Sequence, residues 1–147
     1  MKTKSLIFTA LLFTVIGLAS CKKSTTTPTS SNSTFVATLN GASETPGTGS
    51  AATGTATFTY NPSTYILSGT VSFSGVTATA AHIHKGAVGT AGAVVFTLGT
   101  ALPTSPISFS SVLDANELAD LMANLYYVNV HSASFPGGEI RGQLLKQ

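Results

Sequence analysis

From Phe35 onward, the sequence consists of short runs rich in Thr, Val, Ser and Phe, separated at intervals by Gly, Pro and Asn. β-branched and aromatic residues favour extended strands, and the intervening residues favour turns. Runs of this length indicate strands rather than long helices. We therefore expect about seven to eight strands, at residues 35–40, 54–60, 65–74, 79–84, 93–98, 107–111, 126–131 and 139–145.

One segment breaks this pattern and predicts a helix. Asp114 and Glu117 have the spacing of N-cap and N3 in a capping box. Apolar residues then recur at helical spacing, at Leu118, Leu121, Met122 and Leu125. A single helix at about 114–125 among many strands favours a mainly β fold, an antiparallel β-sandwich or small barrel, over an alternating α/β fold.

The first 20 residues have the organisation of a signal peptide. Lys2 and Lys4 precede an apolar run, Leu6 to Leu18, which is shorter than the about 20 residues that span a bilayer. The run ends in Leu18-Ala19-Ser20-Cys21, which resembles a bacterial lipobox, and Cys21 is the only cysteine in the chain. We predict that residues 1–20 are removed and that Cys21 is lipidated.

A lipid on Cys21 makes the membrane a partner of the protein and places it in the bacterial cell envelope. Residues 21–34 are Ser/Thr-rich without apolar periodicity, which predicts a tether. Residues 35–147 have the length of one domain. Lys22 stands where an aspartate retains some lipoproteins at the inner membrane, so the outer membrane is favoured.

Charge excludes one class of partner. Of the seven basic residues, Lys2 and Lys4 belong to the predicted signal peptide, which leaves five against five acidic residues. A neutral chain offers no basic surface for nucleic acid. We expect no nucleic-acid partner.

Polar residues with potential for chemistry fall on one face of three predicted strands. Successive side chains of a strand alternate between faces, so His82 and His84 share a face that Ile83 does not. The same division holds near the C-terminus. There Tyr127, Asn129, His131, Glu139, Arg141 and Gln143 alternate with Val128, Val130, Ile140 and Leu144. If these strands are neighbours, the polar set converges.

Three interpretations of this polar set remain open. His82, His84 and His131 can form a site for a single Zn²⁺ or copper ion, with Glu139 as a fourth ligand or as a partner that orients an imidazole. Alternatively, Glu139 pairs with Arg141 or a histidine, and the histidines hydrogen-bond to the backbone across strands, in a closed structural network. Thirdly, Arg141, Glu139 and Asn129 belong to a recognition surface for a protein or glycan.

The sequence favours a non-enzymatic role, and we assign no catalytic residue. No Gly-x-Ser-x-Gly motif is present. Asp114 and Asp120 belong to the predicted helix, and nothing in the pattern brings Glu44 to Glu139 as a hydrolytic carboxylate pair.

Three motifs carry a resemblance to a known family. They are the opening segment from Phe35 to Pro46, the segment Ala81-His82-Ile83-His84-Lys85-Gly86, and the pair of C-terminal segments Tyr127–Ser132 and Pro136–Leu144. Together they resemble the CHRD domain, found in the developmental inhibitor chordin and in many microbial secreted proteins.

This resemblance implies an immunoglobulin-like or superoxide-dismutase-like β-sandwich. Together with the predicted anchor on Cys21, we expect a non-enzymatic binding or structural module at the cell envelope. Three histidines are too few for a copper–zinc dismutase centre. A single metal ion, with a redox-linked role, remains the alternative.

Overall fold

The computed structural model describes residues 31–99 and 101–147. The predicted signal peptide, the predicted lipidation site Cys21 and tether residues 22–30 lie outside the described residues. Among those described, no helix has the length and apolarity needed to cross a membrane.

The predicted mainly β fold with one short helix is confirmed. The 3₁₀ turn η1 spans Gly41–Ser43 and the helix α1 spans Ala115–Met122. The strands are β1 (Ser33–Asn40), β2 (Thr53–Asn61), β3 (Ile66–Ser74), β4 (Ala78–Lys85), β5 (Val94–Thr97), β6 (Ile107–Val112), β7 (Tyr126–Ser132), β8 (Ile140–Gln143) and β9 (Leu145–Lys146).

Helix α1 begins where the capping pattern places it. The Asp114 carboxylate accepts hydrogen bonds from the backbone N–H groups of Asn116 and Glu117, at 2.8 Å each. The Glu117 carboxylate in turn accepts from the Asp114 N–H, at 2.8 Å. The helix therefore satisfies its first free N–H groups with its own side chains.

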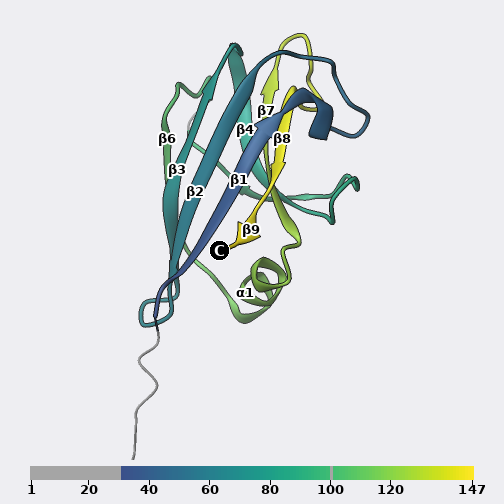
Figure 1. Ribbon diagram of the computed structural model, residues 1–147. Coiled ribbons are helices and arrows are strands. Elements are labelled where there is room, and N and C mark those ends of the chain that lie inside the picture. Colours follow the sequence, from purple (N-terminus) through teal and green to yellow (C-terminus); the bar gives the residue numbers. More distant parts are fainter. Residues whose placement is uncertain (1–30, 100) are drawn as a thin grey trace, which may run out of the picture.

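The strands form one curled antiparallel sheet in the order β5-β4-β7-β8-β1-β2-β3-β6, with β9 paired to β1 (Figure 1). The sandwich or barrel expected from the sequence therefore takes the form of a half-barrel. At its two edge strands, the rings of Phe96 in β5 and Phe109 in β6 lie 5.4 Å apart between centroids. Apolar side chains thus fill the space between the two edges.

The core occupies the inside of this curl. Ile83, Val128, Val130 and Ile140 are fully buried there, together with Phe35, Phe58 and Leu67 from the opposite wall. Burial of each such side chain contributes about 1.5–3 kcal/mol to folding. The alternation predicted for the histidine-bearing strands is therefore correct, and their polar residues lie on the face away from this core, where most of them are also buried.

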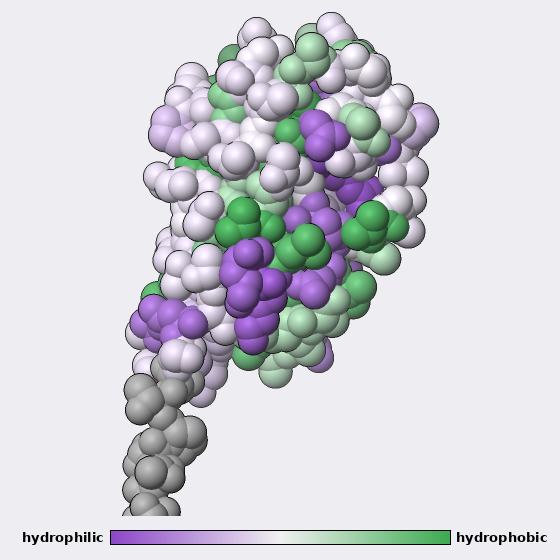
Figure 2. All heavy atoms as spheres, in the orientation of Figure 1, coloured by the Kyte–Doolittle hydropathy of each residue, from purple (hydrophilic) through white to green (hydrophobic). Residues whose placement is uncertain are grey.

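The two walls differ in outward chemistry. Strands β1, β2 and β3 carry no charged residue, and their exposed positions are Thr38, Thr53, Thr55, Thr57, Ser68, Thr70, Ser72 and Ser74. Much of the surface in the view of Figure 2 is correspondingly pale, neither strongly hydrophilic nor hydrophobic. The histidines, Asn129 and Arg141 lie on the other wall, formed by β4, β7 and β8.

Candidate metal centre

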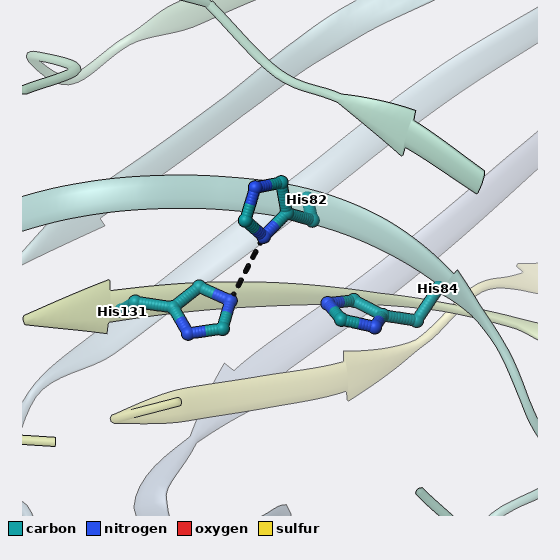
Figure 3. Close-up of side chains that lie close together, drawn as sticks. All are labelled: His82, His84 and His131. Carbon is teal, nitrogen blue, oxygen red and sulfur yellow. Dashed lines mark hydrogen bonds between the residues drawn. The ribbon is translucent and has the colours of Figure 1, made fainter. Parts of the chain in front are cut away.

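Two neighbouring strands bring the three histidines together (Figure 3). His82 and His84 lie two residues apart on β4, and His131 lies on β7. In the antiparallel register Ala80 is opposite His131, and His82 is therefore diagonal to it. A bulge between Ile83 and His84 shifts the pairing of β4 with β5 at this point, a feature that often re-aims side chains at functional sites.

The imidazole nitrogens converge on one point. One nitrogen from each ring lies within 4.8 Å of the other two. Nδ1 of His82 lies 3.0 Å from Nε2 of His131, the contact drawn in Figure 3. His84 and His131 are 9 % and 8 % exposed, and His82 is half-buried.

Backbone carbonyls fix the tautomers of two histidines. Nδ1 of His84 donates to the Gly92 carbonyl oxygen at 2.9 Å, and Nδ1 of His131 donates to that of Pro136 at 3.0 Å. A carbonyl oxygen only accepts, so both protons are on Nδ1 and both Nε2 atoms carry a lone pair. Carbonyls hold metal-binding histidines in this way and raise their basicity as ligands.

The two lone pairs have different surroundings. Nε2 of His131 accepts from Nδ1–H of His82. Nε2 of His84 is buried and has no hydrogen-bond partner among the described residues. Buried polar nitrogens are nearly always paired, and an unpaired one indicates a function or an ion.

Burial favours the neutral form of His82 and His84. Desolvation lowers the pKa of His82, and the neighbouring His131 and His84 lower it further. Desolvation also lowers the pKa of His84, together with His131 and Arg141, against the opposing hydrogen bond to Gly92. Neutral imidazole is the form that binds a metal ion.

Glu139, Asn129 and Arg141 lie on the same wall but outside this group. The Glu139 carboxylate accepts from Ser50 Oγ at 2.7 Å and is not among the converging ligand atoms. The suggested pair of Glu139 with Arg141 does not form, because the only ion pair in residues 31–99 and 101–147 joins Lys85 to Asp120, at 2.7 Å. Asn129 donates instead to Glu44, at 3.0 Å.

The comparisons with known proteins decide the family. The family model described as the CHRD domain matches residues 35–144, most of the chain. This chain belongs to the CHRD family. Neither the curated proteins nor the solved structures gave a significant match.

An aromatic ring supports the site of this CHRD domain. Tyr127 of β7 stacks on His84, with centroids 5.0 Å apart and planes within 7°. The Arg141 guanidinium lies 3.4 Å from the centroid of the same ring and donates to the Ala87 carbonyl at 2.9 Å. Tyr127 thus fixes the ring plane of His84, while Arg141 holds the loop between β4 and β5.

Hydrogen bonds from the histidines to the backbone were among the expectations, but the sequence does not identify the residues that accept them in this CHRD domain. Gly92 and Pro136 act through backbone carbonyls, which every residue has, so no residue type marks them. Glu44 lies in the segment from Phe35 to Pro46, where the sequence assigns it no partner. Its contact with Asn129 spans 85 residues, and no local pattern carries such a contact.

Proposed function

We propose that this CHRD domain binds one transition-metal ion, zinc or copper, through Nδ1 of His82 and Nε2 of His84 and His131. The observation that carries this proposal is the buried, unpartnered Nε2 of His84, which converges with nitrogens of the other two rings. A closed structural network would leave no such atom, because its members satisfy one another.

The donor set fits these metals. Three imidazoles suit zinc and copper and leave a further coordination position open. Metal–nitrogen bonds of about 2.0–2.1 Å separate the bound nitrogens by about 3–3.5 Å. The 3.0 Å contact between His82 and His131 lies in this range, and the 4.8 Å limit on the others requires only small ring movements.

Metal binding requires one tautomer change. Without metal, His82 donates its Nδ1 proton to His131. When a metal ion occupies the site, that proton belongs on Nε2 of His82, so that Nδ1 presents a lone pair. The other two histidines already carry their protons on Nδ1, where the carbonyls hold them.

The test is metal analysis of the purified domain, with thermal melts before and after a chelator. At a metal concentration about 100 times Kd, binding stabilises by about 2.7 kcal/mol. In a domain of this size that raises Tm by on the order of 10 °C. His84→Gln should abolish the rise. Ser50→Ala removes the hydrogen bonds to Glu139 and from the Ala52 N–H but no contact of a histidine, and should keep it. Absence of stoichiometric metal and of any shift with Zn²⁺ or Cu²⁺ would contradict the proposal.

The proposed cellular setting is a lipid anchor on Cys21 that holds the domain in the bacterial cell envelope, at the outer membrane, as a non-enzymatic binding module. The support is the Leu18-Ala19-Ser20-Cys21 motif after an apolar run. Several acyl chains hold a protein stably, at about 0.8 kcal/mol per buried CH₂.

Fractionation tests the anchor. Cys21→Ser should move the protein from the membrane fraction to the soluble fraction, and Ser24→Ala should leave it membrane-bound. A Cys21→Ser variant that stays with the membrane would contradict the lipid anchor without bearing on the metal site.

A further inference from the structure

A cavity opens at Arg141, and none of the three histidines lines it. It has a volume of about 230 Å³ and lies between η1 and the loop from β4 to β5. Arg141 and Gln143 of β8 line it from one side, Ser43 and Glu44 from another, and Val88 from the loop. This volume is below the range of about 300–1,000 Å³ typical of drug-sized ligands, so it suits a ligand of a few non-hydrogen atoms.

Arg141 brings a buried positive charge to this cavity. The residue is 3 % exposed, and its one hydrogen bond runs from Nη2 to the Ala87 carbonyl. In the described part of the chain, no carboxylate forms an ion pair with it. A buried charge without an ionic partner is costly, and an anion beside it removes that cost.

Glu44 faces the same cavity but forms no ion pair with Arg141. Its carboxylate accepts both of its side-chain hydrogen bonds from the Asn129 amide, at 3.0 and 3.3 Å. Burial raises the pKa of Glu44, and the nearby Arg141 opposes this rise. An ionised Glu44 repels an anion in the cavity, whereas a protonated Glu44 can donate a hydrogen bond to it.

We infer that this cavity binds a small carboxylate-type oxyanion, held by the free N–H groups of Arg141. A guanidinium presents several N–H donors in a planar arrangement that matches the two oxygens of a carboxylate. The Tyr127 ring and the Ala87 carbonyl fix the plane of the guanidinium in advance. None of the proposed metal ligands lines the cavity, so anion binding can be measured on metal-free protein.

The experiment is an NMR titration of chelated, metal-free protein with sodium acetate, against sodium chloride at equal ionic strength. Acetate should give saturable shifts at the amides of Ser43, Val88 and Arg141. Chloride should not reproduce them. The inference is overturned if acetate gives no saturable shifts beyond those of chloride in either the wild type or Glu44→Gln.

Charge variants sharpen the result. Glu44→Gln removes the repelling carboxylate and should tighten acetate binding by on the order of tenfold. Arg141→Gln should abolish binding, and Arg141→Lys, which keeps the charge but not the planar donors, should weaken it. Glu117→Gln on α1 removes an equal charge away from the cavity and should bind as the wild type does. Weaker binding in Glu44→Gln, or unchanged binding in both Arg141 variants, contradicts the inference.

Discussion

At the scale of single residues, the chemistry of this domain depends on which nitrogen of each imidazole carries the proton. Gly92 and Pro136 set that proton on Nδ1 of His84 and His131. Tyr127 fixes the plane of the His84 ring. Two of the three proposed ligands are therefore oriented before a metal ion arrives, which reduces the cost of binding.

The pH dependence of the metal-free protein follows from the histidines. The pKa values of His82 and His84 are lowered from the ordinary 6.5 by burial. Below 6.5 the unfolded chain binds protons that the folded protein does not, so stability falls as the pH decreases through the folded pKa values. The Tm of chelated protein should therefore decrease from about pH 7.5 to about pH 5.5. A double His82→Gln, His84→Gln variant should show a flatter profile.

Glu44 acts in the opposite direction. Its pKa is raised from 4.5, mainly by burial, so the stability that it contributes is fully present below 4.5 and is lost as the pH rises through the folded pKa. On acidification Glu44 therefore partly offsets the effect of the histidines. Glu44→Gln should make the decrease in Tm steeper, and a shallower decrease in this variant would contradict the assignment.

At the scale of elements, the loop before β8 allows a specific comparison of two adjacent glycines. Gly138 has φ of +130°, and a Cβ there would clash with the Asn129 amide and lie 2.6 Å from Glu44 Oε1. Gly137 has open space around it. Gly138→Ala should cost about 1–3 kcal/mol of unfolding free energy, and Gly137→Ala less than about 0.5 kcal/mol. Denaturant unfolding measures both, and equal costs would contradict this geometry.

Helix α1 offers a second test at this scale. Asp114→Ala removes the acceptor of two backbone N–H groups and should cost about 1 kcal/mol. Asn116→Ala, at an exposed position in the same turn, keeps the cap and should be close to neutral. Thermal unfolding compares the two variants, and an equal loss in both would show that the cap is not the cause.

At the scale of the whole molecule, the sequence predicts the strands well because their side chains alternate strictly. Ile83, Val128 and Ile140 face the core as the pattern requires, and His82, His84 and His131 share the other face. The pattern does not predict which side chains from different segments meet in the folded protein. Glu139 belongs to the polar face but precedes the first residue of β8, and there it meets Ser50 rather than a histidine.

The oriented imidazoles also depend on the whole chain. Gly92 and Pro136 lie in loops that connect different pairs of strands, and only the folded sheet brings their carbonyls to His84 and His131. Periodicity within a strand predicts a face, but it does not predict what a distant loop places over that face. The candidate ligands were therefore predictable, and the groups that orient them were not.

The central claim is that the three histidines hold one metal ion. Anomalous diffraction at the zinc or copper absorption edge, from crystals of metal-loaded domain, tests it most directly. We expect one peak about 2.0–2.1 Å from Nδ1 of His82 and from Nε2 of both His84 and His131. The proposal would be contradicted by a metal-loaded crystal that shows no peak at this position and keeps the hydrogen bond between His82 and His131.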